Sequence, residues 1–176
     1  MRKSAWMLAA VSLSIVSPAM AQGITLARGE EAVLEIDDGG IADAARGPAS
    51  PTPFEVAVGQ RFSGQKPPEA PVAEGIPIHN GNGLPNAPVP DPGKLRFRFF
   101  QVPGTDHSML IVHNGYDQGL VYRARITANG KTTPTDVCLV MPGKSGVEHW
   151  PFAISAIEVS AFELVAWKPE DGLPCK

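Results

Sequence analysis

Beyond its N-terminal region, the chain has no apolar run long enough to span a membrane. A shorter apolar run at residues 4–16 follows Arg2 and Lys3 and leads to Ala19-Met20-Ala21. A basic start, a short apolar run and small residues before the cut are typical of a cleaved secretory signal. We therefore predict a signal peptide at residues 1–21, and an exported single domain at residues 22–176 without a membrane span. An uncleaved N-terminal anchor is the alternative.

Basic residues are in the minority. Residues 22–176 contain 13 Lys and Arg against 18 Asp and Glu, which gives a formal net charge of −5. An acidic chain without a basic tract repels nucleic acid as a whole, because the phosphate backbone is negatively charged. We therefore expect no nucleic-acid partner.

Cysteine is scarce, with Cys138 and Cys175 as the two examples. In an exported protein, an even cysteine count favours a disulfide, and two cysteines allow one intramolecular pairing. We therefore expect Cys138 to pair with Cys175. Free thiols or thiolate ligands are the alternative.

Motifs for nucleotide binding and hydrolysis are missing. Gly143-Lys144-Ser145 resembles the end of a phosphate-binding loop, but that motif needs a glycine at position 138, where Cys138 stands. No Gly-x-Ser-x-Gly or His-Glu-x-x-His segment occurs. The sequence therefore predicts neither an enzyme nor a bound cofactor.

Alternating apolar residues and turn residues are abundant, with 18 glycines and 18 prolines. Runs of alternating or β-branched residues predict strands, and clusters of Gly, Pro, Asn and Asp predict the turns between them. The expected strands are two within residues 24–40, separated at Gly29-Glu30, and one within each of residues 54–62, 94–102, 107–115, 119–128, 137–142 and 152–167. Residues 41–46 suggest one helical turn at most, and residues 128–136 a loop. In residues 152–167, Phe162 and Leu164 fit the apolar face only after a bulge or break near Ser160-Ala161.

The pattern as a whole predicts an all-β fold. Short strands without a long helix are typical of an antiparallel β-sandwich, immunoglobulin-like in the loose sense, with a small β-barrel as the runner-up. A Pro-rich loop at residues 66–93 interrupts the strands and has eight prolines between Lys66 and Pro92. Such a loop is either a surface crossover or a binding loop.

Four arginines stand out on two predicted strands. Arg96 and Arg98 share one face of their strand, and Arg123 and Arg125 share one face of theirs. If the two strands are neighbours, the guanidinium groups form a patch for an anionic glycan or an acidic partner. Pairing with cross-strand acids on a solvated sheet face is the alternative.

Residues 136–151, DVCLVMPGKSGVEHWP, combine several candidate metal ligands. The order of Cys138, Met141 and His149 does not suit a blue-copper site, and a disulfide would consume the thiolate. A zinc or copper site built from His113, Glu148 and His149 remains open. The same Glu148-His149-Trp150 corner is a possible contact surface, in which Trp150 is either a core residue or a contact residue.

The sequence therefore favours an exported, non-enzymatic binding or accessory protein of the cell envelope or extracellular space. Its partner would be a protein or an anionic glycan. A metal-binding protein that uses His113, Glu148 and His149 is the alternative function, and a component of a larger assembly is a third.

Overall fold

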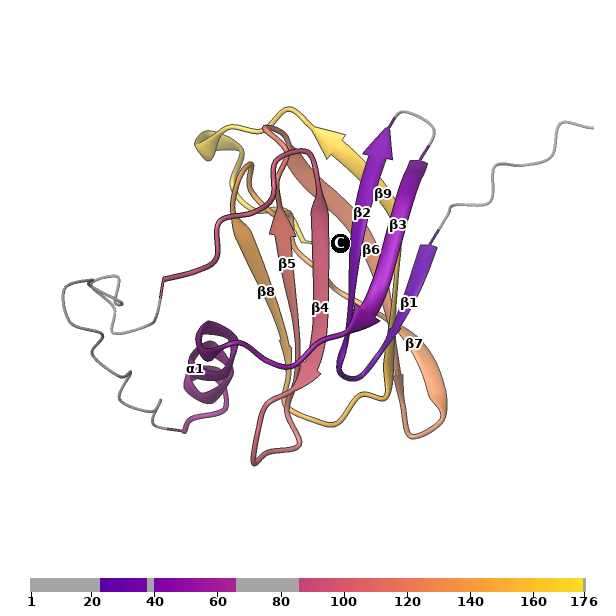
Figure 1. Ribbon diagram of the computed structural model, residues 1–176, viewed down its shortest axis with the longest axis vertical. Helices are drawn as coiled ribbons and strands as arrows, with labels where there is room; N and C mark the ends of the chain where they lie inside the picture. Colours follow the sequence, from indigo (N-terminus) through magenta and orange to yellow (C-terminus); the bar gives the residue numbers. More distant parts are fainter. Residues whose placement is uncertain (1–22, 38–39, 66–85, 176) are drawn as a thin grey trace, which may run out of the picture.

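The computed structural model describes residues 23–37, 40–65 and 86–175. Its strands form two antiparallel sheets that pack face to face, one of four strands in the order β1-β9-β6-β7 and one of five in the order β3-β2-β4-β5-β8 (Figure 1). The strands are β1 (Gly23–Ala27), β2 (Glu30–Asp37), β3 (Gly40–Pro48), β4 (Leu95–Gln101), β5 (Ser108–Asn114), β6 (Gly119–Ala128), β7 (Lys131–Thr135), β8 (Ser145–Trp150) and β9 (Ala156–Val165). The predicted all-β sandwich is confirmed, and the described strands do not close into a barrel.

The main core lies between the two sheets. Apolar side chains at alternate positions of the central strands point inward, as Leu95, Phe97 and Phe99 do on β4. Tyr122 on β6 meets Phe97 from the opposite sheet, with ring centroids 5.7 Å apart in an edge-to-face arrangement. This strict alternation leaves the outer faces of both sheets available for other contacts.

Residues 54–62, predicted as a strand, form instead most of the helix α1 (Pro53–Phe62). The local reason is a capping box, in which Thr52 and Glu55 each accept a hydrogen bond from the other's backbone N–H, with Pro53 in the first turn. Phe54 and Val58, four residues apart, share one face and contact the sheet. The alternation that suggested a strand is thus also compatible with helical spacing.

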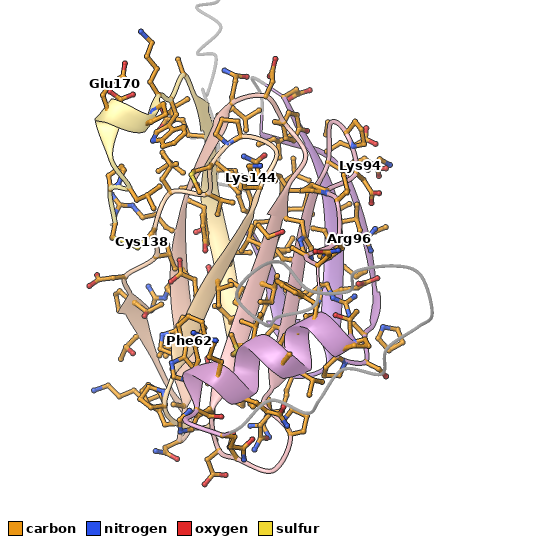
Figure 2. All side chains as sticks on the ribbon, turned by 90° about the vertical axis from the view of Figure 1, so that its left-hand side faces the viewer. Phe62, Lys94, Arg96, Cys138, Lys144 and Glu170 are labelled. Carbon is orange, nitrogen blue, oxygen red and sulfur yellow. A yellow bond between two sulfur atoms is a disulfide. The ribbon has the colours of Figure 1, made fainter. Side chains whose placement is uncertain are left out.

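The helix lies over part of the outer face of the five-stranded sheet (Figures 1 and 2). A second apolar cluster lies beneath it, formed by Val58 of α1 with Phe100, Val102, Met109 and Ile111. Gly59 allows the close approach, because a Cβ at this position would lie 2.9 Å from a methyl carbon of Val102. One face of this sheet is therefore buried by the other sheet, and part of the opposite face by α1.

Three strands were missing from the sequence prediction, or predicted as something else, and all three lie at sheet edges. β3 was predicted as one helical turn, β7 as a loop, and β8 as a turn and a corner. An edge strand is held by backbone pairing on one side, so it needs no apolar alternation, and β7 even contains Pro134. Conversely, the strand predicted at residues 137–142 is wrong, since this segment makes isolated bridges at Val140 and Cys138.

The predicted irregularity in the last strand is present. β6 and β9 shift register between Val121 and Arg123, and Ala161 has a φ of 52° in the left-handed region. The bulge reverses the alternation of β9, so that Phe162 packs against Phe97 at a centroid distance of 5.6 Å. Without it, Glu163 would point into the core instead.

Cys138 and Cys175 form a disulfide, which ties the C-terminal segment to the segment before β8. The predicted signal peptide and residues 66–85 of the Pro-rich loop lie outside the described residues. Residues 86–93 of that loop form irregular structure leading into β4. The described part of the chain contains no helix with the length and apolar character that crossing a bilayer requires.

Candidate functional site

The four arginines do not form a single patch, which corrects the hypothesis of one shared anion site. Arg96 and Arg98 lie on β4, in the five-stranded sheet, whereas Arg123 and Arg125 lie on β6, in the other sheet. Each pair points away from the core, so the two pairs face opposite sides of the sandwich. Sequence spacing gave the face within each strand but could not give the sheet to which each strand belongs.

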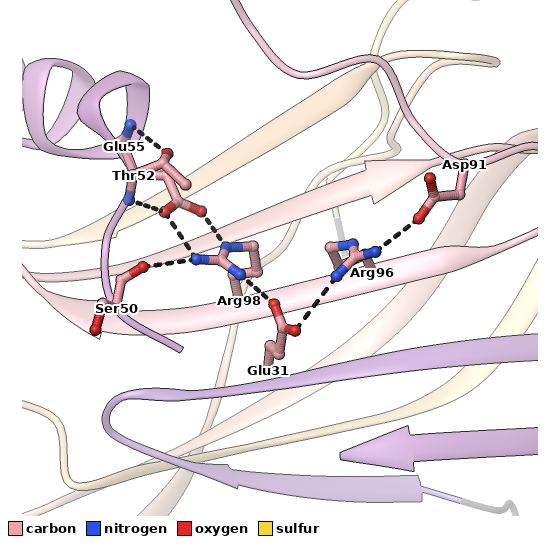
Figure 3. A network of polar contacts seen from close by, with 7 residues as sticks. All are labelled: Glu31, Ser50, Thr52, Glu55, Asp91, Arg96 and Arg98. Atoms are coloured by element: carbon pink, nitrogen blue, oxygen red, sulfur yellow. Dashed lines mark hydrogen bonds and ion pairs between the residues drawn. The ribbon is translucent and has the colours of Figure 1, made fainter. Parts of the chain in front are cut away.

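Arg96 and Arg98 belong to a ladder of alternating charges on the outer face of β4 (Figure 3). Arg98 donates to Glu55 at the start of α1 and to Glu31 on β2. Arg96 donates to the other oxygen of Glu31 at 3.3 Å and to Asp91 at 2.6 Å. Both guanidinium groups are thus already neutralised by carboxylates. This arrangement anchors α1 and residues 86–93 to the sheet and leaves little attraction for an anion.

Burial and charge shift the pKa of groups around this ladder. The hydrogen bond from Arg96 lowers the pKa of Asp91. The imidazole of His113 on β5 is 4% exposed, and its burial lowers its pKa below the ordinary 6.5. Arg96 and Arg98 lower it further, whereas Glu55 and Asp91 act in the opposite direction.

A cavity of about 240 Å³ lies above the ladder. Its walls come from the start of α1, from residues 88–91 and from β4 and β5; the lining residues are Thr52, Glu55, Pro88, Val89, Pro90, Asp91, Arg96, Arg98 and His113. The Oγ of Ser145 lies 2.7 Å from the Nδ1 of His113. Ser145 does not line this cavity, so a molecule bound there would meet the imidazole and not the hydroxyl.

The second arginine pair lies on the outer face of the four-stranded sheet. Arg125 stands opposite Glu158 on β9, with Nε and Oε2 3.8 Å apart, and both side chains are about half exposed. Arg123 stands opposite Ser160. This is the solvated sheet face that the sequence left as the alternative.

His113, Glu148 and His149 do not converge on one point, which corrects the metal-site hypothesis. Glu148 and His149 are adjacent on β8 and point to opposite faces of the sheet. His113 pairs with Ser145 and His149 with Met109, so the two histidines are four residues apart along the sheet, about 13 Å at strand rise. Among the residues that the structure describes, no group of three or more His, Cys, Asp and Glu is arranged to hold a metal ion.

Glu148 instead points inward and is partly buried. Its Oε1 accepts the backbone N–H of Cys138 at 2.8 Å and lies 3.5 Å from the hydroxyl of Tyr122. Burial raises the pKa of Glu148, and it raises that of Tyr122 well above its usual value. The carboxyl group thus secures the disulfide-bearing segment to the core.

Trp150 is a core residue and not a contact residue. Its side chain is 7% exposed and belongs to the cluster between the sheets, and its Nε1–H donates to Thr135 on β7 at 3.0 Å. The proposed contact corner is therefore dispersed, with Glu148 and Trp150 facing inward and His149 facing outward. The sequence could not assign these faces because it did not predict β8.

His149 meets a different histidine. The Nε2 of His149 lies 2.9 Å from the Nδ1 of His107, at the turn before β5, and the ring of Phe62 at the end of α1 lies 5.4 Å away. Burial lowers the pKa of His149, and the charge of His107 adds to this. One ring nitrogen donates to the other, so the pair joins β8 to the β4–β5 turn.

A second cavity is lined by the ends of β2 and β9. This cavity, which we call the mouth, has a volume of about 490 Å³ and is lined by Ile36, Asp37, Tyr116, Gln118, Phe162, Glu163 and Leu164. The hydroxyl of Tyr116 donates to the backbone oxygen of Ile36 at 3.2 Å and accepts its N–H at 2.9 Å, which fixes that wall. The mouth thus combines apolar walls with two acidic residues.

Sequence reasoning missed the mouth, although one signal for it was present. The register slip near Ser160-Ala161 is what brings Phe162 and Leu164 to the inner side of β9. Which residues of the opposite sheet they face depends on tertiary packing. No family model, curated protein or solved structure matches this chain.

Proposed function

We propose that this chain is an exported, non-enzymatic binding protein of the cell envelope or extracellular space, and that it holds a polypeptide partner at the mouth. The predicted signal peptide supports export, and the Cys138–Cys175 disulfide is compatible with an oxidising compartment. The arginine ladder and the histidine pair are bonded to neighbours within the fold, which leaves them less suited to hold a partner.

The observation that carries the proposal is the composition of the mouth. Ile36, Phe162 and Leu164 are partly buried apolar residues that still line an open cavity. Concave apolar sites with a few polar groups are the usual places where proteins bind ligands. Glu163, which lines the mouth from β9, adds negative charge to this site, which favours a polypeptide with basic residues over an anionic glycan.

Site-specific photo-crosslinking in the producing cell tests this proposal. A photoreactive amino acid at Gln118, in the mouth, should give a protease-sensitive adduct. The matched control places it at Val89, which is 89% exposed and lines the cavity above the ladder. Adducts at Val89 without adducts at Gln118, or an adduct that resists protease and is degraded by glycosidases, would contradict the proposal.

A further inference from the structure

The strand β9 consists of two halves that differ in their pairing. Residues 156–160 pair with β1 on one side and with β6 on the other. Beyond the bulge, Val121 of β6 stands opposite Glu163 and Gly119 opposite Val165, but β1 ends at Gly23, opposite Ser160. Within residues 23–37, 40–65 and 86–175, nothing pairs with the other side of residues 161–165. In the part of the chain that the structure describes, this half of β9 is thus an open sheet edge.

Cleavage of the predicted signal peptide would remove the residues that could continue β1 along this edge. If cleavage follows Ala21, one residue, Gln22, precedes β1. A continuation of β1 along residues 162–165 would need several residues upstream of Gly23.

The open edge forms one wall of the mouth. Phe162, Glu163 and Leu164 all line the cavity although adjacent side chains of a strand alternate between the two faces. A cavity that meets three consecutive residues of a strand runs along its backbone. Unpaired backbone N–H and C=O groups at such an edge are a template for an incoming strand.

We propose that residues 161–165 accept an extended segment of a partner polypeptide as an added strand, and that this segment carries the pattern apolar–basic–apolar. This inference rests on the proposed binding function and specifies how the partner binds. Residues of the incoming strand beside Phe162 and Leu164 point into the mouth and contact Ile36, so they are apolar. The residue between them lies on the outer face beside Glu163, so it is basic.

The same geometry disfavours a second copy of this chain as the occupant. Two copies that pair antiparallel through residues 161–165 about Glu163 would place the two Glu163 side chains opposite each other. Like charges directly opposite one another destabilise a sheet. The acidic character of the chain, with a net charge of −3 over all 176 residues, adds to this repulsion.

Hydrogen exchange on the isolated mature protein tests the open edge. Amides that face the β1 side should be protected in residues 156–160 and should exchange rapidly in residues 161–165, so that one strand contains its own control. Equal protection in both halves, or a dimer in light scattering that slows the exchange of residues 161–165, would overturn the inference.

The occupant is tested with a displayed library of 12-residue peptides selected on the mature protein. Selected peptides should contain the apolar–basic–apolar pattern, lack proline in it and slow the exchange of residues 161–165. Glu163→Lys should weaken their binding by about tenfold, whereas Val89→Glu, at an exposed apolar position of the other cavity, should not change it. Every second backbone amide of a bound strand points toward β9. N-methylation of that set of amides in the peptide should therefore abolish binding, whereas N-methylation of the other set should not.

The outcomes separate this inference from the proposed function. One outcome is that peptides bind at the mouth and lose affinity with Glu163→Lys, yet tolerate N-methylation of either set of alternate amides. This outcome would overturn strand addition and leave the proposed function standing. Peptides that are insensitive to Glu163→Lys and leave residues 161–165 unprotected would contradict both.

Discussion

Arg98 donates from its Nε to the Oε1 of Glu55 at 2.5 Å, so a guanidinium group on β4 holds the carboxylate that caps α1. The side chain of Glu55 is 1% exposed and that of Arg98 12%. A buried carboxylate needs such a partner, because an unpaired charge in the interior is costly. The docking of the helix onto the sheet therefore depends on a residue 43 positions away in the sequence.

Arg98→Met should strongly destabilise the fold. Removing one partner of a buried ion pair costs about 3–5 kcal/mol, because the other charge remains buried. The measurement is the free energy of unfolding in urea. Arg125→Met is the matched control, since its pair with Glu158 is half exposed and should contribute less than about 1 kcal/mol. Equal losses for the two variants would contradict the structural role of the ladder.

Ala161→Gly should stabilise the protein by up to about 1 kcal/mol, because Ala161 has a φ of 52° and the left-handed region is unfavourable for a residue with a Cβ. Ala161→Val should destabilise it, since a β-branched residue adopts this conformation still less readily. Ala156→Gly, in the regular half of β9, provides the control and should cost about 0.5–1 kcal/mol. Thermal denaturation of the three variants measures the effect. If Ala156→Gly also stabilised the protein, the left-handed conformation at the bulge would not be the cause of the stabilisation by Ala161→Gly.

Removal of the disulfide by Cys138→Ala with Cys175→Ala should lower the free energy of unfolding by about 3–4 kcal/mol, as loop-closure models give for a separation of 37 residues. The midpoint of urea unfolding measures this loss. Addition of a reductant should shift the midpoint of the parent protein and leave that of the double variant unchanged. A midpoint that the reductant does not move in the parent would contradict a disulfide that stabilises the fold.

His113 should make the protein less stable in mild acid. Its folded pKa lies below the ordinary 6.5 because it is buried, so the unfolded chain binds the proton more readily than the folded one. The resulting stability is fully present above pH 6.5 and decreases as the pH falls from 6.5 toward the folded pKa. His113→Gln should therefore flatten the dependence of the urea midpoint on pH in this window.

His149→Gln provides the comparison for this pH effect. Burial lowers the pKa of His149 as well, but this ring is less buried than His113, so the flattening should be smaller. Glu148, whose raised pKa acts in the opposite direction, is unchanged in both variants. A steeper effect at His149 than at His113 would contradict burial as the cause.

The sequence correctly predicted which side chains of a single strand face the core. The inward positions of Leu95, Phe97 and Phe99 follow from period-two alternation, and the slip at Ser160-Ala161 follows from its interruption. The pairing of Cys138 with Cys175 follows from there being two cysteines. These inferences succeed because their cause lies within a few residues, or within a single possible pairing.

The helix α1 shows where local reading failed. Phe54, Val56 and Val58 alternate as in a strand, and the competing signal was the capping box of Thr52 and Glu55. β8 shows a second kind of failure, since an edge strand needs no periodic apolar face. Without β8, the inward direction of Trp150 and Glu148 and the meeting of His149 with His107 could not be predicted.

By itself, the sequence determined the β-rich class, the turns, the disulfide pairing and the faces within each central strand, because these depend on short-range sterics and on burial of an apolar face. Tertiary structure alone decided that Arg96 and Arg98 lie in a different sheet from Arg123 and Arg125, and that β2 and β9 enclose the mouth. Sheet membership and cross-strand register arise from pairings between distant segments, whose choice depends on the whole core being filled at once.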